Sequence, residues 1–315
     1  MSSLPREPAP EHYRYSILRY AAATRPAFLS VTVGACLLGF ASAQRQLIPW
    51  QFDTAFLTLY FTLLLHAASN VLNDVCDTRA DAGNHDRIYP FTGGSRFIQN
   101  GVLTRQQSLS LALVLFGAAL PAGLYLGLTH DWPLWIIGVL GLFCGWAYSA
   151  PPFALVSRGL GEAVIFVVWL LVAAAADYGQ RGAFSWWPFF IGAPCALLIV
   201  NILFINQFPD RLSDADAGKR TLVVRLGAAR AKWLYLAVAC LAHGWLLWLI
   251  ATNRLPPQAA AGGLSIVFSL HAARALIRYA EATHQLVGAI KHSILAAILH
   301  AVLLAAALFW VGFGS

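Results

Sequence analysis

The chain has 315 residues, of which 59% are hydrophobic and only 11% are charged, and its formal net charge is +7. Charged residues make up about 25% of an average soluble domain, so this composition excludes a soluble globule and a disordered chain. The five cysteines are scattered without a CxxC pair, which is not the spacing of a zinc site or a disulfide framework. We therefore expect an integral membrane protein with several spanning helices.

Stretches without Asp, Glu, Lys or Arg mark the expected helices, because about 20 apolar residues cross the hydrocarbon core of a bilayer. In chain order these stretches are 26–44, 54–73, 106–130, 132–157, 163–176, 182–209, 233–253, 255–273 and 293–315. Only the fifth is short, at 14 residues, so Glu162 or Asp177 is expected at or below the membrane surface. The sequence predicts an all-α polytopic protein with nine transmembrane helices in a single domain, 26–315, after a partly disordered segment, 1–25.

Basic residues concentrate on one side of this arrangement. The segments 1–25, 74–105, 207–232 and 274–291, together with Arg158, hold 18 of the 21 Lys and Arg residues. Because cytoplasmic loops carry the excess of Lys and Arg, we expect a cytoplasmic N-terminus and, after nine crossings, a C-terminus outside. This topology accounts for the positive charge, and nucleic acid binding is not expected.

An acidic string of the form N-x3-D-x3-D occurs twice, after the second and the sixth helix. Its members are Asn73, Asp77 and Asp81 in the first copy and Asn206, Asp210 and Asp214 in the second. A spacing of four places each trio on one helical face, where like charges repel and the C-terminal end of the helix dipole is unfavourable. The repeat therefore predicts a bound divalent cation, such as Mg²⁺. Pro209 lacks the N–H that continues a helix, which predicts a kink where the second copy begins.

Basic residues and glycines follow each acidic string. Arg87 and the run TGGSR at 92–96, which ends in Arg96, come after the first, and GKRT at 218–221, with Lys219, after the second. Glycine allows backbone N–H groups to approach an anion, and Lys or Arg supplies the opposing charge. Beside metal-binding acids, these residues predict a bound diphosphate.

These strings resemble the UbiA superfamily of intramembrane aromatic prenyltransferases. The resemblance covers most of the chain, through Arg25-Pro26, GGSR at 93–96, YSAPP at 148–152, RGLGE at 158–162 and GKRTLVVRLG at 218–227. The last string is most similar to the branch that prenylates 1,4-dihydroxy-2-naphthoate in menaquinone biosynthesis. The resemblance implies nine helices around a central cavity that opens to lipid, in a prokaryotic plasma membrane. The loops 74–105 and 207–232 would cap this cavity on the cytoplasmic side.

The resemblance also implies the reaction, which is Mg²⁺-dependent transfer of an isoprenyl chain from a polyprenyl diphosphate to an aromatic acceptor. Two Mg²⁺ ions would be held by Asn70, Asn73, Asp74, Asp77 and Asp81 and by Asn206, Asp210 and Asp214. Substrate would be bound by Arg25, Arg87, Arg96, Tyr148, Arg158, Glu162 and Lys219. The residues expected to be catalytic are Asp77, Asp210 and Lys219. Aromatic side chains can shield an allylic cation, and the candidates are Tyr148, Phe91 and Phe204.

Alternatives stay open at several points. Glu162 either orients the acceptor or Arg158, or forms an ion pair with Arg158. The acceptor is alternatively 4-hydroxybenzoate or homogentisate. A cation-coupled secondary transporter is the alternative of another class, but transporters place ionisable groups near the bilayer midplane, and here the helix interiors are nearly free of charge. The histidines in or near spanning helices, which are His66, His243, His271 and His300, are expected to be packing residues.

Overall fold

The computed structural model describes residues 5–13, 15–44 and 48–313, and all regular secondary structure in these ranges is helical. The longer helices are α2 (Ser30–Gln44), α3 (Phe52–Cys76), α5 (Arg105–Thr129), α6 (Trp132–Ala147), α7 (Gly161–Arg181), α8 (Trp187–Asp216), α10 (Ala228–Ala251), α11 (Ile266–Tyr279) and α12 (Val287–Phe313). The short α-helices are α1 (Ser16–Ala23), α4 (Thr78–Ala82) and α9 (Leu222–Leu226). The 3₁₀ helices are η1 (Pro10–His12), η2 (Pro26–Leu29), η3 (Val156–Arg158), η4 (Pro257–Ser265) and η5 (Thr283–Leu286). Residues 1–4 of the segment expected to be partly disordered lie outside the described residues.

Eight helical segments in the described part of the chain are long and apolar enough to cross a membrane. Large apolar side chains also cover outward faces, and Phe52, Leu128, Trp132 and Trp310 are each at least 70% exposed. Exposure on this scale is unfavourable in water but not in lipid. The structure therefore supports an all-helical integral membrane protein. The expected crossing that is not among these eight is the fourth, 132–157, where α6 has 16 residues and covers about 24 Å.

The short helix is thus the fourth and not the fifth, contrary to the sequence-based expectation. α6 ends at Ala147, because the prolines at 151 and 152 cannot continue a helix. α7 extends over 21 residues, because its ionisable side chains have partners. Asp177 pairs with Arg181 one turn later at 2.8 Å, and both side chains are buried. Ionisable residues therefore did not mark the ends of this helix.

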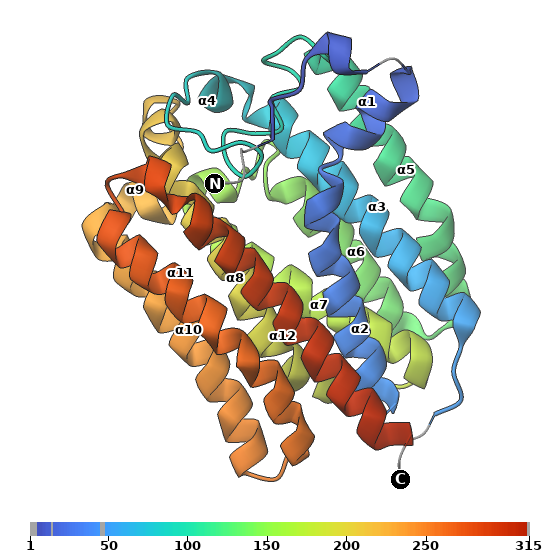
Figure 1. Cartoon of the computed structure of the whole chain (residues 1–315). Helices are drawn as coiled ribbons and strands as arrows, with labels where there is room; N and C mark the ends of the chain where they lie inside the picture. The colour runs from blue at the N-terminus through green and yellow to red at the C-terminus, as the bar shows by residue number, and fades with distance from the viewer. Residues whose placement is uncertain (1–4, 14, 45–47, 314–315) are drawn as a thin grey trace.

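The helices pack side by side, with α3 and α5 as neighbours toward one side, α10 and α11 toward the other, and α12 crossing in front between them (Figure 1). Between them, α2, α7 and α8 pack against one another, and a continuous apolar core joins α2, α8 and α12 through Leu38, Leu198 and Leu304. The chain segments that precede α5 and α10 lie at the same end as α1, with α4 among them (Figure 1). That end carries both acidic strings.

Candidate active site

The first acidic string crosses a junction between two helices. α3 ends at Cys76, Asp77 lies at the junction, and α4 begins at Thr78. The one-turn spacing nevertheless persists, because the Asp77 N–H donates to the Asn73 carbonyl at 2.8 Å and the Asp81 N–H to the Asp77 carbonyl at 2.9 Å. Asn73, Asp77 and Asp81 therefore keep the shared face that their spacing predicts.

The second acidic string lies on one continuous helix. α8 runs through Pro209 to Asp216, so Pro209 does not end the helix, and the kink expected there stays a prediction. A proline removes one N–H donor from the helix, and here the turn that follows it stays helical. The Ser213 hydroxyl donates to the Asp210 carbonyl at 3.0 Å in that turn. The junction lies in the first string instead.

Lys219 joins the two strings. Its Nζ lies 2.8 Å from Asp77 Oδ2 and 3.0 Å from Asp214 Oδ1. Burial alone would lower the pKa of Lys219, but the carboxylates of Asp77 and Asp214 outweigh burial and raise it. The ammonium group is therefore a fixed positive charge between carboxylates from opposite halves of the chain.

Asp210 is held by the loop that follows the first string. Asn84 Nδ2 donates to Asp210 Oδ1 at 2.5 Å, and the Gly93 N–H donates to the same oxygen at 3.0 Å. Gly93 has a φ of +71°, a conformation that glycine adopts without steric penalty. The sequence predicts that this glycine run binds an anion, and the anion it contacts is a carboxylate of the protein itself. Asn84 was not expected, because it belongs to neither string.

Arg25 and Asp74 form a further ion pair of the site. An Arg25 guanidinium nitrogen bonds Asp74 Oδ1, which also accepts the Ser95 N–H at 3.1 Å. Burial would lower the pKa of Arg25, but the charges of Asp74 and Asp81 raise it. Arg25 lines the cavity described below, whereas Asp74 is not among the lining residues.

Asp81 is a carboxylate of the first string that the described residues leave incompletely satisfied. Its Oδ2 is buried and has no hydrogen-bond partner among the described residues. Burial, and then the negative charges of Asp77 and Asp74, raise the pKa of Asp81 to about 8. The amide oxygen of Asn206, in the second string, is also buried without a partner there. Orphaned acceptor oxygens in both strings are the donor atoms that a hard cation such as Mg²⁺ prefers.

These oxygens do not form a complete metal site. Within the ranges that the structure describes, no group of three or more His, Cys, Asp or Glu side chains is arranged to hold a metal ion. Mg²⁺ usually keeps several waters and binds through one or two carboxylates plus substrate phosphates. The donor set therefore fits Mg²⁺ ions that share their coordination shell with a phosphorylated substrate.

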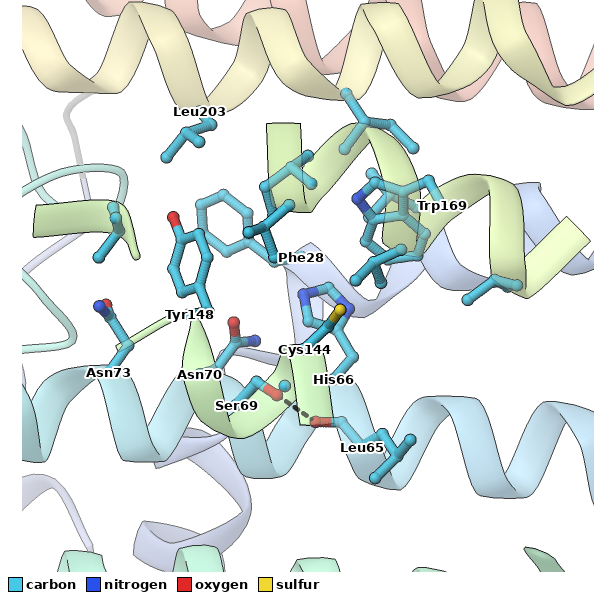
Figure 2. A pocket seen from close by; sticks show the side chains of 18 of the residues that line it. Phe28, Leu65, His66, Ser69, Asn70, Asn73, Cys144, Tyr148, Trp169 and Leu203 are labelled. Atoms are coloured by element: carbon cyan, nitrogen blue, oxygen red, sulfur yellow. Dashed lines mark hydrogen bonds between the residues drawn. The ribbon is translucent and has the colours of Figure 1, made fainter. Parts of the chain in front are cut away.

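A cavity of about 300 Å³ extends from the two strings into the helix bundle. Asp77, Asp210 and Lys219 line the end of the cavity at the acidic strings. Leu126, near the C-terminus of α5, and Leu134, near the N-terminus of α6, line the end away from the strings. Figure 2 shows side chains of α3 pointing toward Tyr148 and Trp169 across this space. The cavity thus has a charged end and an apolar remainder.

Most of the predicted site residues meet at this cavity. Those that line it are Arg25, Asn70, Asn73, Asp77, Asp81, Tyr148, Asn206, Asp210, Asp214 and Lys219. Phe91 also lines it, whereas Phe204 is buried in the core between α8, α10 and α12. Burial and the charge of Glu162 raise the pKa of Tyr148, so its phenol stays protonated.

Arg87 and Arg96 do not line the cavity, because they contact the N-terminal segment. Arg87 Nε donates to a carboxylate oxygen of Glu7 at 2.7 Å, and Arg96 Nε lies 3.8 Å from the other oxygen. Arg96 also donates to the Asp81 carbonyl at 2.6 Å. Nothing in the sequence indicated that Glu7 would reach this loop.

Arg158 and Glu162 also lie outside the cavity lining, and they do not pair with each other. Arg158 is exposed and donates to the Pro152 carbonyl at 2.7 Å. Glu162 instead accepts from Gln207 Nε2 at 2.6 Å, and Gln207 lines the cavity. The alternative of a Glu162–Arg158 ion pair is therefore wrong.

A membrane-spanning bundle with carboxylates and cations at one end of an apolar cavity is the arrangement of an intramembrane enzyme. The model of the UbiA prenyltransferase family matches residues 32–295. The chain therefore belongs to this family, as the acidic strings predicted, and is a prenyltransferase.

Several proteins that are similar to this chain are named for prenyl transfer to naphthoquinone or naphthoate compounds. The chain is 30% identical to a 2-carboxy-1,4-naphthoquinone phytyltransferase of Synechocystis sp. over 94% of both chains. It is 32% identical to the 1,4-dihydroxy-2-naphthoate octaprenyltransferase of Escherichia coli over 73% of this chain and 74% of that protein. A Bacillus subtilis protein of the latter name is 25% identical over 74% of each chain.

Solved structures share the fold. A UbiA homologue from Aeropyrum pernix superposes with a TM-score of 0.67 at 16% identity, covering 89% of this chain and 97% of that one. A UbiA homologue from Archaeoglobus fulgidus, bound to GPP and Mg²⁺, gives a TM-score of 0.59 at 14% identity, covering 92% and 99%. At this identity the likeness establishes the fold alone.

Proposed function

We propose that this protein catalyses the Mg²⁺-dependent transfer of an isoprenyl chain from a polyprenyl diphosphate to an aromatic acceptor. The observation that carries the proposal is Lys219, which links Asp77 of the first string to Asp214 of the second above an apolar cavity. Two carboxylate clusters and a cation at a cavity mouth suit a diphosphate bound through metal ions, with its prenyl chain in the cavity.

Two Mg²⁺ ions fit this arrangement. We assign one to the first string and its flanks (Asn70, Asn73, Asp74, Asp77 and Asp81) and one to the second (Asn206, Asp210 and Asp214), where Asp81 and Asn206 offer orphaned oxygens. Bound there, Mg²⁺ supplies positive charge that stabilises the leaving diphosphate. An Archaeoglobus fulgidus homologue of the same fold was solved with bound GPP and Mg²⁺, which supports a dependence on Mg²⁺.

The chain's own residues perform the remaining tasks. Lys219 and Arg25 line the charged end of the cavity and would neutralise the diphosphate as the carbon–oxygen bond lengthens. Their carboxylate partners, Asp74, Asp77 and Asp214, would hold the Mg²⁺ ions. Tyr148 and Phe91 are the aromatic groups near this end, where they would stabilise the allylic cation by cation–π attraction and exclude water.

The acceptor we propose is 1,4-dihydroxy-2-naphthoate, in menaquinone biosynthesis. Several relatives are named for octaprenyl transfer to this acid, and the chain covers about three quarters of their length. 4-Hydroxybenzoate and homogentisate are the competing acceptors. We place the protein in a prokaryotic plasma membrane with the N-terminus and the active site facing the cytoplasm, because the segments at that end are rich in Lys and Arg.

The test is turnover by purified protein in lipid nanodiscs. With Mg²⁺, a polyprenyl diphosphate and each of the three acceptors, mass spectrometry should detect a prenylated product of the naphthoate, in which the ring has lost a proton or its carboxyl group as CO₂, and EDTA should abolish it. Asp77→Asn and Asp210→Asn should lose activity and keep their helical content. Asp86→Asn is the matched control, because Asp86 is exposed in the loop between the strings.

Undiminished turnover in both motif variants would contradict the metal assignment. Solute transport into liposomes without release of diphosphate would favour a transporter instead. Product from another acceptor only would retain the reaction and correct its substrate.

A further inference from the structure

A polar stripe runs along α3 from the acidic string into the apolar part of the cavity. Thr58, Thr62, His66, Asn70 and Asn73 follow one another at steps of three or four residues, and all line the cavity. That spacing puts them on one face of the helix. His66 lies one turn farther from the acidic string than Asn70, about 6 Å along the helix axis.

The His66 ring is held in place from two sides. Its Nδ1 lies 2.8 Å from the hydroxyl of Thr32 on α2, which is completely buried. The edge of the ring meets Trp169 of α7 at 5.2 Å between centroids, with the planes at 77°. These contacts leave the other ring nitrogen, Nε2, toward the cavity, and no described residue forms a hydrogen bond with it.

The hydroxyls of Thr62, in the stripe, and of Ser69, beside it, are satisfied by their own helix, whereas the Thr58 hydroxyl is buried without a partner among the described residues. The Thr62 hydroxyl donates to the Thr58 carbonyl at 2.8 Å, and the Ser69 hydroxyl donates to the Leu65 carbonyl at 2.8 Å (Figure 2). His66 differs, because its free nitrogen faces open space. Polar groups in protein interiors almost always have a partner, so a nitrogen fixed in this orientation suits a polar atom of a ligand.

The end of the cavity away from the acidic strings has a different chemistry. Leu126 of α5, together with Leu134 and Ile137 of α6, presents an apolar surface there. A prenyl chain fits that end because it carries no polar atoms beyond its diphosphate. An aromatic acceptor that bears oxygen substituents fits the part of the cavity beside His66. The two regions would therefore separate the two substrates.

We propose that His66 binds an oxygen substituent of the aromatic acceptor through Nε2 and so sets which ring carbon faces the prenyl group. The proposal rests on the proposed function, since it concerns the acceptor of that reaction. Thr32 decides the direction of the bond. If its hydroxyl donates to Nδ1, then Nε2 carries the proton and donates to the acceptor oxygen, and in the opposite tautomer Nε2 accepts from a hydroxyl.

Kinetics of two His66 variants test this role. His66→Leu should raise the KM for the naphthoate acceptor about tenfold, the loss expected for one hydrogen bond, and should leave the KM for the diphosphate within twofold. His66→Gln keeps a polar end and should recover most of the affinity. His271→Leu is the matched control, because His271 is exposed on α11. Equal increases in both KM values would mean a structural role and overturn the proposal.

Acceptor analogues provide a second arm. Blocking the bound oxygen by O-methylation should reduce kcat/KM of the wild-type protein about as much as His66→Leu does. In the leucine variant the same methylation should have no further effect, and its product should be a mixture of positional isomers. Additive losses, with a single product isomer in the variant, would overturn the assignment.

Calorimetric binding of dihydroxynaphthoate separates this inference from the proposed function. Binding that His66→Leu weakens, without product from the wild-type protein, would support the role of His66 and contradict the proposed reaction. Turnover by the wild-type protein with unchanged acceptor binding in the variant would support the proposed reaction and contradict the role of His66. A wild-type protein that binds no aromatic acceptor would overturn both.

Discussion

The two acidic strings are the same pattern in the sequence, and the structure surrounds them differently. At the first position, Asn73 donates to Asp77 and to Ser149, whereas the amide oxygen of Asn206 is buried without a partner among the described residues. At the second position, Asp77 pairs with Lys219. The two strings therefore already differ in how far their polar groups are satisfied.

The remaining positions extend the contrast. Asp210, the counterpart of Asp77, is held by Asn84 and the Gly93 N–H from the loop of the first string. Asp214 pairs with Lys219, while its counterpart Asp81 keeps an orphaned oxygen. Both carboxylates of the second string are thus paired with other groups, whereas one carboxylate oxygen of Asp81 in the first string has no partner among the described residues. The two copies of the repeat therefore contribute differently to one site.

The largest effect is expected from breaking the link between the strings. Lys219→Met removes the cation between Asp77 and Asp214, so that the carboxylates face each other without it and the diphosphate loses a positive partner. Turnover should fall by about 10²- to 10³-fold, as on loss of other groups that stabilise developing charge. Steady-state kinetics would measure it, with Lys219→Arg retaining part of the activity and the exposed Lys291→Met unchanged. A loss smaller than tenfold would mean that the link has no part in the chemistry.

Equivalent positions should respond in opposite ways to the same substitution. Asp214→Asn leaves Lys219 with one carboxylate fewer, and the free energy of unfolding should fall by about 1–3 kcal/mol. Asp81→Asn replaces a buried carboxyl group whose Oδ2 has no partner in the described structure, so stability without Mg²⁺ should be unchanged or higher. Thermal unfolding in EDTA compares the two variants directly. Similar losses in both would show that the strings are equally satisfied after all.

Most of the differences between the two strings could not be predicted from the sequence. Composition and charge-free stretches predicted an all-helical membrane protein, and the N-x3-D-x3-D string predicted which carboxylates meet, because both depend on local periodicity. The partners of Asp210 were missed, since Asn84 and the Gly93 N–H reach it through a loop conformation that no spacing encodes. Arg87 and Arg96 were expected at the diphosphate, but a distant acid, Glu7, contacts them instead.

The pH dependence of stability should report the free carboxylate of the first string. The pKa of Asp81 is raised from 3.8 to about 8, so the folded state holds this proton more tightly than the unfolded state does. Without Mg²⁺, stability is therefore expected to decrease as the pH rises from about 4 to about 8. Saturating Mg²⁺ should reduce that decrease, because the ion favours the ionised carboxylate, and Asp81→Asn should reduce it without metal. Unfolding temperatures across this pH range would test it, and a slope unaffected by both changes would contradict the assignment.

The smallest effect concerns the N-terminal segment, which contacts the loop after the first string. Glu7 binds Arg87 and Arg96 and also accepts from Asn100 at 3.2 Å. The Arg87 and Glu7 side chains are 28% and 30% exposed, and ion pairs with this much access to solvent contribute about 0–1 kcal/mol. Glu7→Gln should therefore lower the free energy of unfolding by less than about 1 kcal/mol. If the freed Arg87 turns to the diphosphate, the KM for that substrate should fall severalfold while the acceptor KM stays constant. Glu11→Gln, at an exposed acid in the same segment, is the control, and an unchanged diphosphate KM would confine Glu7 to a structural role.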